Sequence, residues 1–114
     1  MTELDKLMQA LNSSAVTFAL DYQYEEEITD REYGVVDVET AGPALWADDK
    51  LIFQPFTVSV WLYSPQQDSA TWRTVQSKLD EAKVSYALTE ARHWLDDLGL
   101  WEWCWTVSLD EWGA

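Results

Sequence analysis

Two stretches of the chain carry apolar side chains at the three- and four-residue spacing of an amphipathic helix. The first spans residues 4–11, with Thr2 placed to cap it. The second is capped by Asp68 or Ser69 and runs to Ala82. Its apolar stripe consists of Trp72, Val75, Leu79 and Ala82, and its outer face contains Arg73, Lys78 and Lys83. We therefore expect two helices, each with one apolar face to bury.

Elsewhere apolar and polar residues alternate, which is the period of a half-buried β-strand. The strands expected from this alternation span residues 16–24, 31–40, 51–63, 84–95 and 100–109. Turns are expected at Ala47-Asp48-Asp49-Lys50 and at Asp96-Asp97-Leu98-Gly99, where short acidic side chains and a glycine favour chain reversal. Pro55 has no N–H to donate, so it indicates an edge position or a bulge. The residues after Leu109 are expected to fray.

This order of elements predicts an α+β domain, α-β-β-β-α-β-β, with two helices on one face of a mainly antiparallel sheet. The 114 residues are enough for a single domain spanning 1–114, and a hydrophobic share of 47% can fill its core. No apolar stretch approaches the ~20 residues of a membrane-spanning helix. Met1 opens a helix rather than a secretion signal, so we expect neither a membrane segment nor secretion.

The chain is strongly acidic, with 21 Asp and Glu against 7 Lys and Arg and a formal charge of −14. Nucleic-acid binding depends on Lys and Arg that neutralise phosphates, and this chain has no basic cluster, so we expect no direct nucleic-acid binding. The densest acidic patch consists of Glu25, Glu26, Glu27, Asp30 and Glu32. Such a patch is either a solvated loop between two strands or an acidic surface that repels or mimics DNA.

Candidate catalytic chemistry is sparse. Cys104 is the only cysteine, so no intramolecular disulfide forms, in agreement with a reducing compartment. A thiolate nucleophile would need His93, the only histidine, and one cysteine with one histidine cannot supply a zinc site. The least implausible group for a small enzyme is Glu90, Arg92 and His93, beside which we find no nucleophile or cofactor site. We expect no enzyme, no cofactor and no metal.

Eight tryptophans in 114 residues supply an unusual amount of aromatic surface. Trp101, Trp103 and Trp105 lie on one side of the last expected strand, where the helices should cover them. Two short helices cannot cover all eight rings, so part of this surface should lie in a subunit interface. Trp61 and Tyr63 are candidates because they alternate against the core-facing residues, and Trp101 is a third. A stacking platform for sugar rings remains an alternative.

Several short segments follow one another in a particular order along nearly the whole chain, after the opening helix. They are Phe18-Ala19-Leu20-Asp21-Tyr22, Ala47-Asp48-Asp49-Lys50, Trp61-Leu62-Tyr63-Ser64, the acid-opened helix from Asp68 through Leu79, Val84-Ser85-Tyr86, Trp94-Leu95 and Leu100-Trp101. Each segment is a loose pattern. Their order and spacing together resemble the small tail-terminator (tail-completion) proteins of long-tailed bacteriophages.

This resemblance implies a non-enzymatic protein of the virion tail, made in the host cytoplasm, that assembles with itself into a hexameric ring. Such rings stop polymerisation of the tail tube and then join the tail to the head. The implied partners are therefore the tail-tube protein and a head-completion or connector protein, with no catalytic residues to carry over. The Trp content and the acidic excursion at residues 25–32 depart from the family pattern.

The acidic patch has a different meaning under each function. In a ring, the patch at residues 25–32 would line the lumen and repel DNA, which would keep the duplex mobile. The alternative is a DNA mimic that inhibits a nucleic-acid-binding enzyme, with carboxylates in place of phosphates. The carboxylates concerned would be Glu25, Glu26, Glu27, Asp30, Glu32, Asp37 and Glu39. A mimic predicts a monomer or dimer, whereas a tail terminator predicts a ring.

Overall fold

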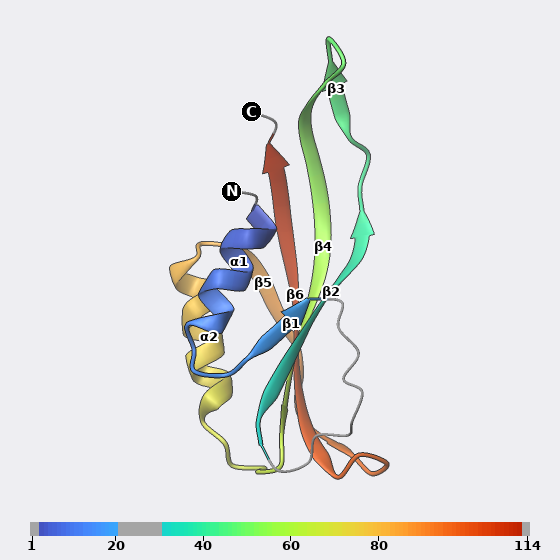
Figure 1. Cartoon of the computed structure of the whole chain (residues 1–114). Helices are drawn as coiled ribbons and strands as arrows, with labels where there is room; N and C mark the ends of the chain where they lie inside the picture. The colour runs from blue at the N-terminus through green and yellow to red at the C-terminus, as the bar shows by residue number, and fades with distance from the viewer. Residues whose placement is uncertain (1–2, 21–30, 113–114) are drawn as a thin grey trace.

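A six-stranded sheet with both helices on one face forms the body of the protein (Figure 1). The structure is a computed structural model and describes residues 3–20 and 31–112. Its elements are α1 (Glu3–Asn12), β1 (Phe18–Leu20), β2 (Tyr33–Ala41), β3 (Leu45–Ala47), β4 (Lys50–Ser64), α2 (Thr71–Glu81), β5 (Ser85–Leu95) and β6 (Leu100–Trp112). The expected α+β class and the expected order of helices and strands are confirmed, and the structure adds the three-residue β3.

The strands lie in the order β1-β2-β4-β6-β5, with β3 paired to the outer end of β4. All pairs are antiparallel except β1 and β2, which are parallel. A tight hairpin cannot connect parallel strands. β1 and β2 are therefore not the two strands of one hairpin.

Two expectations about strand positions are wrong. Pro55 lies neither on an edge strand nor at a bulge in the ladder with β6, because β4 is central and Pro55 pairs with Asp110 in an unbroken register. On the other side of β4 the neighbour changes from β2 to β3, and there the Gly42 N–H donates to the Pro55 carbonyl over 2.8 Å. The missing N–H of the proline thus falls where the ladder is already interrupted. Residues 110–112 were expected to fray but are ordered, since β6 stays paired with β4 to Trp112.

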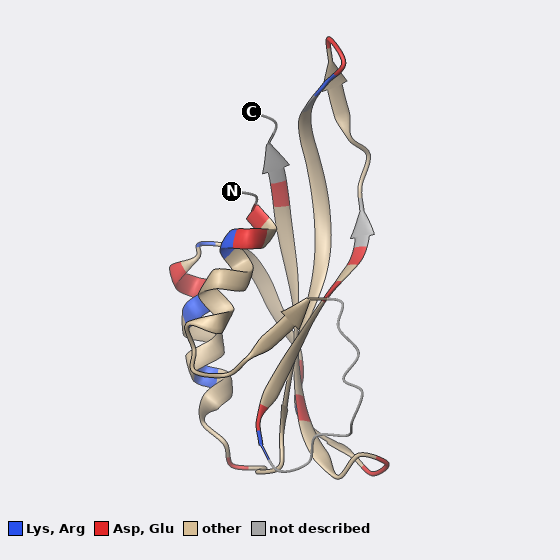
Figure 2. Cartoon of the chain, in the orientation of Figure 1, with Lys and Arg blue, Asp and Glu red and all other residues tan. Residues whose placement is uncertain are grey.

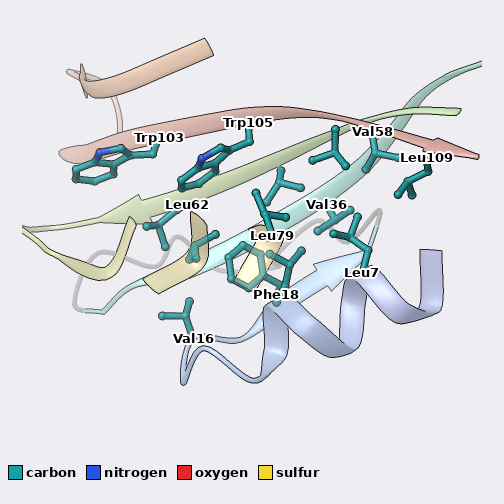
Figure 3. Packing of buried hydrophobic residues seen from close by; sticks show 14 residues of the cluster. Leu7, Val16, Phe18, Val36, Val58, Leu62, Leu79, Trp103, Trp105 and Leu109 are labelled. Carbon is teal, nitrogen blue, oxygen red and sulfur yellow. The ribbon is translucent and has the colours of Figure 1, made fainter. Parts of the chain in front are cut away.

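The core lies between the helices and the sheet (Figure 3). The sheet contributes alternate residues of its central strands, among them Val58, Val60 and Leu62 of β4, all fully buried. The helices contribute Leu7, Leu11, Val75 and Leu79, also fully buried. Trp103 and Trp105 lie beneath the helices as expected, and the Trp105 Nε1–H donates to Gln76 of α2 over 3.1 Å. This hydrogen bond satisfies the one donor that a buried indole carries.

Glycine is required at one point of the sheet. Gly34 lies beside Phe18 in the parallel pair of β1 and β2, and a Cβ added at Gly34 would lie 2.1 Å from a carbon of the Phe18 ring. The missing side chain leaves room for the ring, which is buried in the core. This contact attaches the short β1 to the rest of the sheet.

Candidate assembly surfaces

Neither helix covers the second face of the sheet (Figure 1), on which Tyr33, Trp61 and Tyr63 gather on the paired strands β2 and β4. Trp61 pairs with Val35 of β2 on one side and with Cys104 of β6 on the other. Tyr33 and Tyr63 form the next cross-strand pair, and their rings stack with centroids 5.0 Å apart. Trp61 and Tyr63 are half-buried and point away from the core, as the alternation of the strand predicts. Their role in a subunit interface stays a prediction.

Trp101 lies on the opposite face from Trp61 and Tyr63. It is half-buried against the edge of the core, and its ring contacts that of Trp94, with centroids 4.9 Å apart. The Trp94 indole in turn donates a hydrogen bond to Asp96. The three interface candidates from the sequence are therefore not brought together into one patch.

Burial favours the neutral forms of two ionisable side chains on this face, Tyr63 and Glu102. Burial and the charge of Glu102 raise the pKa of the Tyr63 hydroxyl well above its ordinary value. Burial also raises the pKa of the Glu102 carboxyl, an effect that His93 opposes and Glu90 reinforces. At neutral pH this region presents a phenol that remains a hydrogen-bond donor. It is suited to packing rather than to acid chemistry.

Cys104 and His93 are not cross-strand partners. In the β5–β6 ladder Cys104 lies opposite Glu90, and His93 lies opposite Glu102. Burial raises the pKa of the Cys104 thiol, which keeps it protonated and unreactive. The ladder shifts between Glu90 and His93, and Arg92 takes a φ of 53° there. Across residues 3–20 and 31–112, no three His, Cys, Asp or Glu side chains are grouped closely enough to hold a metal ion.

The acidic patch of the sequence is only partly described. Glu25, Glu26, Glu27 and Asp30 lie outside the described residues. Glu32 has a structural role: its carboxylate accepts hydrogen bonds from Ser69 Oγ over 2.5 Å and from Thr71 Oγ1 over 2.7 Å. It thereby holds the start of α2, where a negative charge also complements the helix dipole.

The cap of α2 differs from the one predicted. The N-cap residue is Ala70, which has no side chain able to accept a hydrogen bond, rather than Asp68 or Ser69. Ser69 contributes from one position earlier, because its hydroxyl accepts the Thr71 N–H over 3.2 Å while donating to Glu32. The neighbouring Ser69 and the distant Glu32 together thus replace the expected cap by a single N-cap side chain.

A hairpin projects from the body at one end of the molecule (Figure 1). We call residues 44–53 the arm: they comprise β3, the facing end of β4 and the turn that joins them. Leu45 and Trp46 are 58% and 60% exposed, and Ile52 is 38% exposed. Asp48 and Asp49 form the turn with φ of 51° and 61°, between the paired Ala47 and Lys50. Two positive φ values define the tight type I′ reversal that suits a hairpin, so the predicted turn is confirmed.

A cleft lies at the opposite end of the molecule, between the start of α2 and β5. It is a hollow of about 340 Å³ lined by Gln67, Asp68, Ser69, Ala70, Trp72, Arg73 and Arg92. The Arg73 guanidinium lies over the Trp72 ring, 5.3 Å from its centroid. We call this hollow the arginine cleft. The sequence alone does not reveal this cleft, because Arg73 and Arg92 lie 19 positions apart and come together only in the fold.

Comparisons with known proteins do not identify the chain. A scan against models of protein families finds no match, and neither does a search of curated proteins. None of the helices in the described residues has the length and apolar character needed to cross a membrane.

Proposed function

We propose that this chain is a tail terminator, a non-enzymatic protein of the phage virion that caps the tail tube and joins the tail to the head-completion proteins. The observation that carries the proposal is the arm, whose Leu45 and Trp46 are more than half exposed. Apolar side chains on a projecting hairpin add nothing to the core of the monomer, and such surfaces mark sites of association. An arm of this kind is useful to a subunit of an assembly.

The proposed assembly is a ring of six copies. A ring closes through a heterologous interface, in which one patch of each subunit meets a different patch of its neighbour. The chain offers chemically distinct patches for this purpose: the arm, the arginine cleft, and the face with Trp61 and Tyr63. Trp101 stays a candidate at the edge of the core.

The acidic composition supports a channel through which DNA passes. Six copies would carry six times the formal charge of −14, which is −84. Acidic groups that face a lumen repel phosphates and keep the duplex from adhering. The formal charge favours a protein that lets DNA pass over one that holds it.

The mass in solution tests this proposal. Light scattering over a range of protein and salt concentrations should give six times 13.2 kDa. Should the protein be a monomer on its own, a pull-down with purified tail-tube protein decides, because the tube would then act as the template for the ring. A monomer that fails to bind the tail tube would overturn the proposal.

A DNA mimic is the second candidate, and the described residues favour it less. Seven carboxylates would stand in for phosphates in a mimic. Of these, Glu32 accepts hydrogen bonds from Ser69 and Thr71 at the start of α2, and Asp37 is half-buried opposite Ser59. A mimic needs its carboxylates on the surface in the spacing of phosphates. Salt-sensitive binding to a basic nucleic-acid-binding enzyme, by a monomer with no affinity for the tail tube, would favour this function instead.

A further inference from the structure

The arm and the arginine cleft have complementary chemistry at the two ends of one molecule. Figure 2 shows acidic residues at the tip of the arm, with one basic residue beside them, and basic residues along α2, whose last turn also contains acidic residues. We propose that the tip of the arm docks into the arginine cleft of a second copy of this chain. This inference rests on the proposed function, since it names the contact that would build the ring.

The tip presents one aromatic ring and two carboxylates to solvent, beside the exposed ammonium group of Lys50, so its net charge is −1. Trp46 is 60% exposed, and Asp48 and Asp49 follow it in the turn. Within the described part of the chain, neither carboxylate has a hydrogen bond or ion pair. Both aspartates occupy left-handed backbone, which non-glycine residues adopt at some energetic cost. The turn therefore holds two unpaired charges at the farthest point of the arm.

The cleft presents the matching groups. Arg73 and Arg92 are exposed, and neither forms an ion pair with a carboxylate of the described residues. Asp68 also lines the cleft, so the cleft contains two positive charges and one negative charge. The start of α2 adds the partial positive charge of a helix N-terminus. In a chain with a formal charge of −14, such a site is an exception.

The two surfaces match in type as well as in sign. Arginine pairs with carboxylates through a planar fork of donors and also stacks on aromatic rings. Arg73 already lies over Trp72, so an entering Trp46 would meet a guanidinium and an indole together. Asp48 and Asp49 would then face Arg73 and Arg92. One docking event would cover the exposed indole and pair the free charges.

The contact must form between two molecules. The tip and the start of α2 lie at opposite ends of the molecule, whose long axis measures 51 Å (Figure 1). A tip that enters the cleft of a neighbour leaves that neighbour's own tip free for a third copy. The contact joins two different patches, so it can repeat from copy to copy, and it forms a ring where the rotation between copies closes.

Two sets of substitutions test the contact from its two sides. The tip variant is Trp46→Ala/Asp48→Asn/Asp49→Asn, in which asparagine suits the left-handed backbone. The cleft variant is Arg73→Gln/Arg92→Asn. Each variant alone should raise the Kd of self-association about a hundredfold. The matched control Lys78→Gln/Lys83→Asn removes the same charge from α2 and from the residue after its C-cap, and Lys83 shares the positive φ of Arg92, but it should leave the Kd unchanged.

Mixing the two variants gives the sharpest result. The tip variant keeps an intact cleft and the cleft variant keeps an intact tip. In the mixture, each pair of unlike molecules can therefore form one tip-to-cleft contact, and neither member of the pair can bind a third molecule. Sedimentation velocity should show heterodimers in the mixture and monomers in each variant alone. Larger assemblies in either variant alone would overturn the docking while leaving the ring itself in place.

A cross-linking experiment covers the case in which the wild type is monomeric in solution. Asp49→Cys and Arg92→Cys are placed in separate chains, mixed and oxidised, with Cys104 left buried. A disulfide-linked heterodimer is expected, whereas Asp49→Cys mixed with Ser108→Cys should give none. A linked heterodimer with no affinity for the tail tube would keep the docking and overturn the proposed function. Equal linking in both mixtures, or none in the first, would overturn the docking.

Discussion

Val58, Val60 and Leu62 in the second half of β4 are fully buried, whereas Ile52 in the first half is 38% exposed. The strand is continuous from Lys50 to Ser64, and its apolar residues continue from one half into the other. The difference comes from the neighbouring elements. β2 and β6 flank the second half and the helices cover it, whereas residues 50–52 at the start of β4 have only β3 beside them. Hydrophobic pattern predicts a strand, but the neighbouring elements decide whether its side chains stabilise the monomer or remain available to a partner.

The largest expected effect comes from matched tryptophans in the body and in the arm. Trp105→Ala should lower the free energy of unfolding by about 3–5 kcal/mol, because it leaves a cavity in the core and removes the hydrogen bond to Gln76. Trp46→Ala should change it by less than about 0.5 kcal/mol, since the ring is mostly exposed. Urea denaturation of both variants measures the contrast. Equal losses would mean that the arm packs against the body.

A second test probes the contact between β1 and β2. Gly34→Ala should destabilise the body by about 1–3 kcal/mol, because the new methyl would overlap the Phe18 ring. Adding Phe18→Ala should make Gly34→Ala nearly neutral, since the ring that it strikes is gone. A double-mutant cycle by urea denaturation gives the coupling energy. Additive effects would contradict the proposed overlap.

Carboxylates in the two regions should also behave differently. Glu32→Gln should lower the free energy of unfolding by about 1–2 kcal/mol, because it weakens two hydrogen bonds that hold the start of α2. Hydrogen exchange in the first turn of α2 should become faster. Asp49→Asn in the arm removes the same charge from a left-handed position that asparagine tolerates, and it should leave both quantities unchanged.

The smallest expected effect concerns pH. Burial raises the pKa of Glu102 above its ordinary value, so the folded state binds this proton more tightly than the unfolded state. Between the unfolded and folded pKa values, the contribution of Glu102 to stability falls as pH rises. Glu102→Gln should therefore raise Tm at pH 7 and have little effect at pH 3. A Glu102→Gln variant whose Tm is raised as much at pH 3 as at pH 7 would contradict this account.

Local patterns in the sequence predict most of the fold. The alternation and the helical stripes give both helices, the long strands and the burial of Trp103 and Trp105. They do not give the parallel pairing of β1 with β2 or the central place of β4, because strand order depends on contacts between distant segments. The alternation does not reveal that Pro55 falls at the change of neighbours from β2 to β3.

The candidate surfaces were predicted less completely. Alternation correctly turns Trp61 and Tyr63 away from the core. It cannot show that Glu32 binds Ser69 and Thr71, residues 37 and 39 positions away. The arginine cleft likewise depends on the shifted register that gives Arg92 its positive φ. Features built from side chains of separate elements require the three-dimensional arrangement.

The length of β4 has a mechanical consequence. Its 15 residues, at about 3.3 Å each, extend over about 50 Å, nearly the full 51 Å of the long axis. A pull on the arm along this axis would load the ladders with β2 and β6 in shear, so that many hydrogen bonds resist together. The short ladder with β3 is the weakest part and would yield first. The body would thus keep its shape under tension while the arm adjusts at its tip.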